Sequence, residues 1–279
     1  MIRSCLFVPA HNPGMLQTAD LFDADAVIFD LEDAVSYEEK DAARSLLVEF
    51  LKNFKIDIKV IVRINNNPLW FYHDVAAIAT ERLDAVLLPK ADSESLKKAL
   101  SLLIRFEKER HLPKKISLIP LLETATAIMN AEELLARPRI GGVMLGAEDF
   151  TADMGIERTK SGTEILYPRM KIALVARAFH IIAIDTPFTD INDEAGLIKD
   201  ATAARTLGMS AKAAIHPRQI SHINRIFAPS AAQIERAQRI LKKSADTAGV
   251  FSLDGKMIDQ PIIERARKTV EKAKRYKLI

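Results

Sequence analysis

Short apolar runs recur along the 279-residue chain and alternate with longer segments in which polar residues are interspersed. Eight runs are almost continuously apolar, which is typical of strands covered on both faces, as in a parallel sheet. The runs are residues 5–10, 26–33, 59–65, 85–91, 117–124, 142–149, 183–188 and 211–217. The segments between them have helical spacing: in residues 93–110, Leu96, Leu100, Leu103 and Ile104 share one face.

This alternation of eight strands and helices within about 215 residues predicts an α/β fold, a (β/α)8 TIM barrel. A doubly wound sheet is the alternative, but the first turn, FVPAHNPGM, lacks a glycine-rich phosphate motif, and Pro13-Gly14 instead predicts a turn into the first helix. We place the barrel in residues 1–228. Residues 229–279 are expected to form a C-terminal helical lid: a helix from about Ser230 to Gly249, the loop VFSLDGKMIDQP and a last helix from about Pro261.

Charge and cysteine content narrow the class of protein. Forty Lys and Arg against 37 Asp and Glu give a net charge of +3, too weak to predict a nucleic-acid partner. The single cysteine, Cys5, excludes an internal disulfide framework, so we expect a protein of the reducing cytoplasm. Cys5 itself is expected to be a small core residue. No apolar run approaches the roughly 18 residues of a membrane span.

Polar side chains gather at the C-terminal ends of the predicted strands, where barrel enzymes place their active sites. They are Glu32, Asp33, Arg63, Asn65, Lys90, Glu123, Glu148, Asp149, Asp185 and His216. The carboxylates outnumber the cations, so like charges crowd together unless a divalent ion neutralises them. Oxygen ligands with one histidine suit Mg²⁺ or Mn²⁺ better than Zn²⁺. The planar fork of Arg63 suits a substrate carboxylate.

Seven short blocks, in order, resemble the citrate lyase β-subunit group of the HpcH/HpaI aldolase superfamily. They are FVPAHNPGM, FDLEDAVSYEEKDAAR, VRIN, LLPKA, ETA, LGAEDFTADMG and AIHPRQI, and GKMIDQP near the end resembles the lid element of the same lyases. NPGM and GTEILYPR look closer to citrate lyase β-subunits than to malyl-CoA lyases. The resemblance covers nearly the whole chain and implies a Mg²⁺-dependent carbon–carbon lyase on a barrel.

The resemblance also implies roles for individual residues. Glu123 and Asp149 match metal ligands, and Arg63 together with Glu123 matches the substrate contacts. Glu32 and Asp33 match a catalytic pair that hydrogen-bonds metal-bound water. We therefore expect the carboxylates of DLED to lie at the edge of a hydrated magnesium ion.

Further positions follow from the same blocks. The backbone amides of Gly146 and Ala147 are expected to bind a substrate carboxylate, because the glycine permits close approach. Asp30 is expected to be structural. Asp259, in a segment that Gly255 makes able to move as a lid, matches an aspartate that related lyases place in a neighbouring subunit's active site. This implies a homo-oligomer, a trimer or a multiple of it.

The expected reaction cleaves a 3-hydroxy-3-carboxyacyl thioester, citryl-CoA or citryl-carrier protein, into oxaloacetate and an acetyl thioester. Citramalyl-CoA lyase, malyl-CoA lyase and a related acyl-CoA thioesterase remain alternatives, since all would use the same metal site. A non-catalytic carrier-binding or assembly subunit is a further alternative. The sequence does not distinguish coenzyme A from an acyl carrier protein, nor a lone enzyme from one that works with other citrate lyase subunits.

Overall fold

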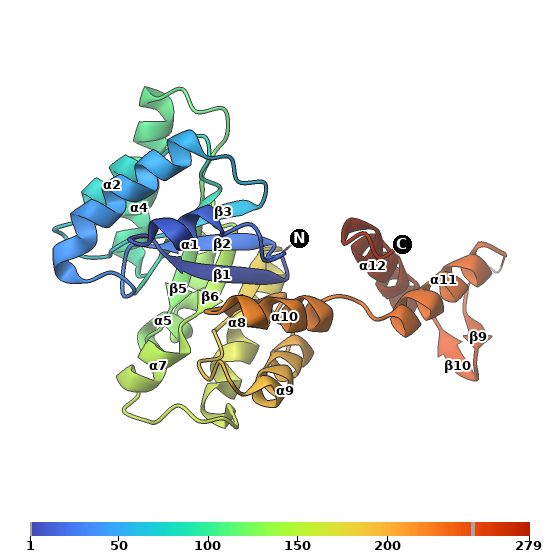
Figure 1. Ribbon diagram of the computed structural model, residues 1–279. Coiled ribbons are helices and arrows are strands. Elements are labelled where there is room, and N and C mark those ends of the chain that lie inside the picture. Colours follow the sequence, from blue (N-terminus) through green and yellow to red (C-terminus); the bar gives the residue numbers. More distant parts are fainter. Residues whose placement is uncertain (1, 247–248) are drawn as a thin grey trace. The chain divides into compact units, whose positions relative to one another are not determined.

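The computed structural model describes residues 2–246 and 249–279 (Figure 1). The chain divides into two compact units, residues 2–223 and the residues from Asn224 onward. The boundary drawn from sequence after residue 228 lies near this division and stays a prediction. No helix in the described part of the chain is long and apolar enough to cross a membrane.

The first unit is a closed barrel of eight parallel strands, so the predicted TIM barrel is confirmed. Each strand pairs with the next along the chain, and the first pairs with the last. The strands are β1 Ser4–Pro9, β2 Ala26–Asp30, β3 Lys59–Arg63, β4 Ala85–Leu88, β5 Ser117–Leu122, β6 Gly142–Leu145, β7 Ile182–Asp185 and β8 Ala211–Ala214. Most end several residues before the predicted runs do, because the polar residues that close those runs have left the ladder.

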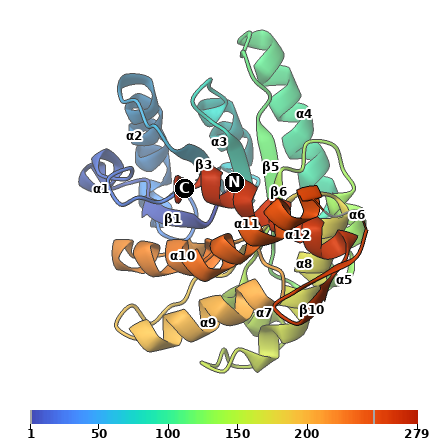
Figure 2. The same cartoon turned by 90° about the vertical axis from the view of Figure 1, so that its right-hand side faces the viewer.

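Helices surround the strands, as Figure 2 shows for α1 to α4 and α8 to α10. The helices of this unit are α1 Pro13–Gln17, α2 Lys40–Asn53, α3 Phe71–Ile78, α4 Ser93–Glu109, α5 Ala125–Met129, α6 Ala131–Leu135, α7 Ala147–Asp153, α8 Leu166–Ala178, α9 Glu194–Thr206 and α10 Ile220–Phe227, which runs into the second unit, with the short 3₁₀ turns η1 Tyr37–Glu39, η2 Thr163–Ile165 and η3 Pro217–Gln219. The prediction that Pro13-Gly14 form a turn before the first helix is wrong, because both residues already belong to α1. Asn12 caps α1 by accepting from Met15 N at 3.1 Å, and Pro13 occupies the first helical position, where its missing N–H costs nothing.

The barrel interior is filled by alternate residues of the strands. Cys5, Ile28, Leu87 and Met144 belong to this core, together with Ile184 of β7. Burial raises the pKa of the Cys5 thiol far above its ordinary value, in keeping with a core residue. Because side chains alternate along a strand, the neighbours of these residues point outward to the helices.

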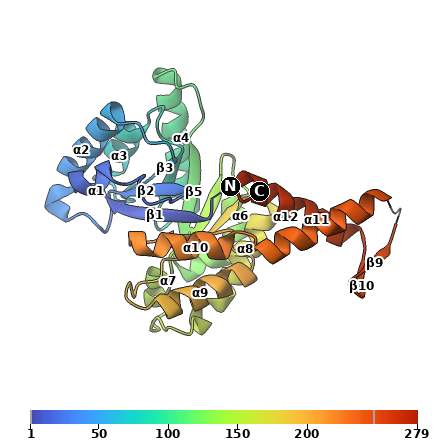
Figure 3. The ribbon, with the colours of Figure 1, turned by 45° about the vertical axis from the view of Figure 1, so that its right-hand side comes forward.

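The second unit contains two helices and a hairpin, α11 Ala231–Asp246, β9 Phe251–Leu253, β10 Lys256–Ile258 and α12 Gln260–Arg275 (Figure 3). The prediction of a loop in VFSLDGKMIDQP is therefore wrong, because this segment contains an antiparallel β-hairpin. Asp254 and Gly255 both have positive φ, 52° and 71°, as a tight Asp-Gly hairpin turn requires. Phe251 and Ile258 pack with Ile240 in a small core of this unit.

Candidate active site

A cavity of about 440 Å³ opens at the C-terminal ends of the barrel strands. Its apolar lining includes Phe7, Met144 and Ile215. Of the site residues predicted from sequence, the cavity is lined by Asp33, Arg63, Glu123, Gly146, Ala147, Glu148 and Asp149. Charged groups therefore face a largely apolar chamber, where electrostatic interactions are strengthened.

Asp30 and Arg63 form the centre of the carboxylate-rich side. They are register partners at the ends of β2 and β3. Asp30, which is 2% exposed, accepts from Arg63 Nε at 2.7 Å and Nη2 at 2.5 Å, and from the backbone N–H of Glu32 and Ala34. Burial lowers the pKa of Arg63, but the hydrogen bonds that its guanidinium donates to Asp30, together with the charge of Asp30, outweigh this and hold that pKa above its ordinary value. The guanidinium fork predicted for a substrate is thus occupied by Asp30, and Nη1 donates to Asp33.

Glu32 and Asp33 lie on the remaining edge of that guanidinium. Glu32 Oε2 is 3.0 Å from Arg63 Nη1, and Asp33 Oδ2 is 3.2 Å from the same atom. The Glu32 contact is not aligned as a hydrogen bond, so this buried oxygen has no hydrogen-bond donor among the described residues. Burial raises the pKa of Glu32 to about 8; the charge of Arg63 opposes this, and neighbouring carboxylates add smaller contributions. Lys40 Nζ supports the loop from below by donating to the carbonyl oxygens of Leu31 at 3.0 Å and Glu32 at 2.6 Å.

Glu123 is a buried carboxylate at the end of β5. Its Oε1 accepts from Lys90 N at 2.6 Å, and burial raises its pKa to about 7. A Cβ on Gly146 would lie 2.5 Å from Glu123 Oε2. The glycine of the LGAED turn is therefore required by the close approach of Glu123.

Asp149 stands across from Lys90 at the mouth. Its side chain is 45% exposed, and Lys90 Nζ lies 3.7 Å from its Oδ2. Burial lowers the pKa of Lys90, but Glu32, Asp149 and Glu123 outweigh it and raise that pKa above its ordinary value. We call Asp30, Glu32, Asp33, Glu123 and Asp149, with Arg63, Lys40 and Lys90, the mouth cluster.

The backbone amides of Gly146 and Ala147, which were expected to bind a substrate carboxylate, already have acceptors within the protein. Gly146 N donates to Leu122 O, and Ala147 N donates to Thr186 Oγ1 at 3.3 Å. The N–H groups of Glu148 and Asp149, in the first turn of α7, have no partner in the described chain. A ligand anion at this turn would meet these two amides without displacing a protein acceptor.

Asp185, predicted at the mouth, is placed elsewhere. Ile184 faces the barrel core, so Asp185 points outward beneath α8 and α9. There it meets Arg169 at 2.8 Å and Lys212 at 2.6 Å, and both cations also bind Asp200. All four side chains are buried, and we call Arg169, Asp185, Asp200 and Lys212 the outer quartet.

Three other polar residues named from sequence have structural partners. Asn65 donates to Asp74 at 2.8 Å and to Leu31 O, and His216 Nδ1 caps η3 by accepting from Arg218 N. Asp259 lies in the second unit, where it caps α12 by accepting from Ile262 N at 3.3 Å. Each of these three side chains therefore has a partner within its own unit.

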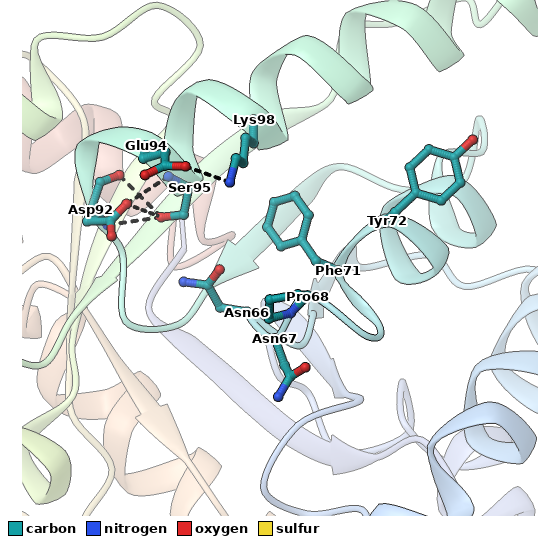
Figure 4. Close-up of a pocket in the computed structure, with 9 residues that line it drawn as sticks. All are labelled: Asn66, Asn67, Pro68, Phe71, Tyr72, Asp92, Glu94, Ser95 and Lys98. Carbon is teal, nitrogen blue, oxygen red and sulfur yellow. Dashed lines mark hydrogen bonds and ion pairs between the residues drawn. The ribbon is translucent and has the colours of Figure 1, made fainter.

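A second cavity, of about 430 Å³, lies between the β3–α3 segment and the start of α4 (Figure 4). Its charged groups satisfy one another: Asp92 and Ser95 form a capping box, and Glu94 pairs with Lys98. Asn66 borders this cavity and donates to the carbonyl oxygens of Pro89 and Lys90. Asn66, at the border of this cavity, thus holds the turn that contains Lys90.

The mouth cluster fits a hydrated divalent cation. Within residues 2–246 and 249–279 no three His, Cys, Asp or Glu side chains converge as a complete cage. Mg²⁺ binds typically through one or two carboxylates and keeps several waters, which suits the open pair Glu123 and Asp149. The unbonded Glu32 Oε2 is an acceptor that a metal-bound water would satisfy.

Sequence reasoning missed the pairing of Asp30 with Arg63. The signal was available, since the predicted runs begin at residues 26 and 59, and Asp30 and Arg63, the fifth residue of each, become neighbours when adjacent strands start in register. No comparable signal marks Lys90, whose backbone has a positive φ of 46°.

Fold and site together define a (β/α)8-barrel protein with a carboxylate site suited to a divalent metal. A model of the HpcH/HpaI aldolase/citrate lyase family matches residues 3–217, and the chain belongs to that family. The resemblance read from the sequence blocks is thereby confirmed.

Three relatives show the range of this family. Citrate lyase subunit beta of Leuconostoc mesenteroides subsp. cremoris is 37% identical, over 99% of this chain and 95% of its own. A (3S)-malyl-CoA thioesterase of Cereibacter sphaeroides is 34% identical, over 97% and 94%. The crystal structure of CitE from Mycobacterium tuberculosis, in complex with magnesium, acetoacetate and coenzyme A, is 30% identical with a TM-score of 0.79, covering 97% of each chain.

Proposed function

We propose that the protein is a Mg²⁺-dependent carbon–carbon lyase that cleaves a citryl thioester into oxaloacetate and an acetyl thioester. The observation that carries the proposal is the anionic excess of the mouth cluster around buried Glu123, with Glu32 Oε2 unbonded. The similarity to citrate lyase β-subunits, and to a CitE that binds magnesium and coenzyme A, supports both the metal and the thioester.

Each residue has a task that its geometry suits. Glu123 and Asp149 would hold the metal, and Arg63 Nη1 and the amides of the α7 turn would bind the carboxylate beside the substrate hydroxyl. A bound Mg²⁺ would supply Lewis-acid chemistry by lowering the pKa of a coordinated hydroxyl. The amides in question are those of Glu148 and Asp149, in place of the predicted Gly146 and Ala147, whose N–H groups have acceptors.

Proton transfer completes the reaction. Glu32, with a pKa raised to about 8, is suited to accept the hydroxyl proton through a water, with Asp33 beside it. The bond between the carbinol carbon and the thioester's α-carbon then breaks, and its electron pair forms an enolate. Protonation of that carbon gives the acetyl thioester, while the former hydroxyl carbon becomes the ketone of oxaloacetate.

The enolate requires a proton donor, and we assign this to Asp259 of a neighbouring subunit in a homotrimer or a multiple of it. Asp259 begins α12 next to the hairpin, and the resemblance of GKMIDQP to the lyase lid element supports the assignment. A cytoplasmic location fits the single buried Cys5. Mixed oligomers of Asp259→Asn and Glu123→Gln subunits should regain partial activity; verified mixtures that stay inactive would place the donor elsewhere.

A screen of citryl, citramalyl and malyl thioesters, each on coenzyme A and on carrier protein, tests the main proposal. Oxaloacetate and acetyl thioester released from the citryl substrate would support the lyase. Free citrate would instead indicate thioester hydrolysis, the second candidate, which the similarity to a malyl-CoA thioesterase favours. Preference for a citramalyl or malyl thioester would reassign the substrate, and no turnover despite Mg²⁺ binding would favour a carrier-binding or assembly subunit.

A further inference from the structure

Lys90 adopts a backbone conformation that its side chain disfavours. Its φ is 46°, in the left-handed region where glycine is accommodated without strain. Six other described residues that are not glycine have positive φ, but they lie before barrel strands, in the hairpin turn or near the C-terminus, whereas Lys90 directly follows a barrel strand. The strain thus lies at the mouth of the barrel, where strained residues are often functional.

The backbone hydrogen bonds of Lys90 account for the conformation of the turn, but they do not require a lysine side chain at this position. Its N–H donates to Glu123 Oε1 at 2.6 Å, and its carbonyl accepts from Asn66 Nδ2 at 3.2 Å. Figure 4 shows Asn66 beside the loop that leads to Asp92. A glycine would make both bonds without strain, so the structure of the turn gives no reason for a lysine.

The side chain also contributes little to the fold. It is 58% exposed, and its one ion pair with a described residue is the 3.7 Å approach of Nζ to Asp149 Oδ2. An exposed pair of this kind stabilises a protein very little. What the lysine adds is an ammonium group, held above a cavity that Glu123 and Asp149 line.

We propose that Lys90 is a substrate-binding residue whose ammonium binds the second carboxylate of the acyl group and so selects citryl thioesters over malyl and citramalyl thioesters. The inference rests on the proposed function. A citryl group carries one carboxylate on the carbinol carbon and another on a methylene, whereas malyl and citramalyl groups lack the latter. Arg63 Nη1 and the α7 amides serve the first carboxylate. Of the two lysines in the mouth cluster, Lys40 donates to two carbonyl oxygens, whereas the exposed side chain of Lys90 can turn toward the second carboxylate.

The test uses Lys90→Gly, which removes the ammonium and relieves the backbone strain, in the full-length protein with saturating Mg²⁺. We expect kcat/KM for citryl-CoA to fall about 20-fold or more, the scale expected when a charge-assisted contact is lost. For malyl-CoA and citramalyl-CoA, kcat/KM should change less than about threefold. These two substrates carry the same coenzyme A phosphates as citryl-CoA, so a loss of phosphate binding would affect all three equally. The melting temperature should equal or exceed that of the wild type.

His111→Gly is the matched control, because His111 has a φ of 52°, is exposed and lies at the opposite end of the barrel, after α4. It should relieve strain without changing substrate preference. Equal losses on all three thioesters, or no loss on citryl-CoA, would overturn the proposal.

Binding of the oxo-acid products separates this proposal from the proposed lyase activity. In calorimetry with Mg²⁺, oxaloacetate should bind the wild type at least tenfold more tightly than pyruvate, which lacks the second carboxylate, and Lys90→Gly should abolish that preference. If the wild type cleaves no thioester but shows the preference, the lyase assignment fails and the Lys90 site stands. If the preference is absent from the wild type or persists in the variant, the Lys90 site fails.

Discussion

The mouth cluster and the outer quartet contain the same kinds of group in opposite states of balance. In the outer quartet two cations meet two carboxylates, every carboxylate oxygen accepts a hydrogen bond, and the side chains are almost fully buried. In the mouth cluster five carboxylates face three cations around a cavity, and the buried Glu32 Oε2 has no donor.

The difference shows how charge is used in this protein. A buried set of ions is tolerated when each charge is compensated, as beneath α8 and α9, where the set fixes β7 and β8 against their helices. In the mouth cluster, burial, with a smaller contribution from neighbouring carboxylates, raises the pKa values of Glu32 and Glu123 and destabilises their ionised forms until a cation arrives. Balance indicates structure, and excess at a cavity indicates a site for a ligand of opposite charge.

The largest expected effect follows from Glu123→Gln, which preserves shape but removes a proposed metal ligand. We expect Mg²⁺ affinity to fall at least tenfold and kcat/KM about 1,000-fold or more, with little change in melting temperature. Calorimetric titration with Mg²⁺ and turnover of the citryl thioester measure these effects, with exposed Glu94→Gln on α4 as the control. Wild-type Mg²⁺ affinity in Glu123→Gln would remove this residue from the metal site.

In the outer quartet, Lys212→Met should act on stability instead. Removing one cation leaves two buried carboxylates with Arg169 alone, at a cost of about 3 kcal/mol or more in the free energy of unfolding. Chemical denaturation measures the loss. Adding Asp200→Asn, which restores the balance, should recover part of it; no recovery would show that volume and not charge makes Lys212 important.

The two clusters also show which features of the fold and of the site could be predicted from the sequence. The apolar runs predicted the barrel because strands buried on both faces leave a nearly continuous pattern, and the strand ends predicted which residues lie near the mouth. The same pattern does not reveal which face a terminal residue takes: Glu123 points to the cavity, whereas Asp185 points outward. The Asp-Gly signal of the hairpin was present in the sequence, but the backbone strain at Lys90 was not.

A smaller effect is expected from pH. Glu32 and Glu123 have pKa values of about 8 and 7 in the folded protein, above an unfolded value near 4.3. Burial therefore favours their neutral forms, and the resulting contribution to stability is complete below the unfolded pKa and lost as pH rises through 7 and 8. Without metal, the free energy of unfolding should fall by on the order of 2 kcal/mol between pH 6 and pH 9.

The control for this decline is the double variant Glu32→Gln/Glu123→Gln, in which it should be much reduced. Saturating Mg²⁺ should also reduce it in the wild type, because the metal binds the ionised carboxylates. Thermal or chemical unfolding across the pH range provides the measurement. A wild-type stability that does not change over this range would show that the mouth carboxylates already ionise at their ordinary pKa.

The smallest expected effect comes from Arg63→Lys. The lysine keeps the charge but cannot bind Asp30 through two nitrogens and present a third to substrate, so kcat/KM should fall about tenfold or more. Since Asp30 also orders the backbone of Glu32 and Ala34, the variant should raise KM as well as lower kcat. Steady-state kinetics beside the exposed control Arg105→Lys gives the comparison. An unchanged kcat/KM would mean that the substrate carboxylate is bound elsewhere and that Arg63 serves only to neutralise Asp30, which would make this part of the mouth cluster as structural as the outer quartet.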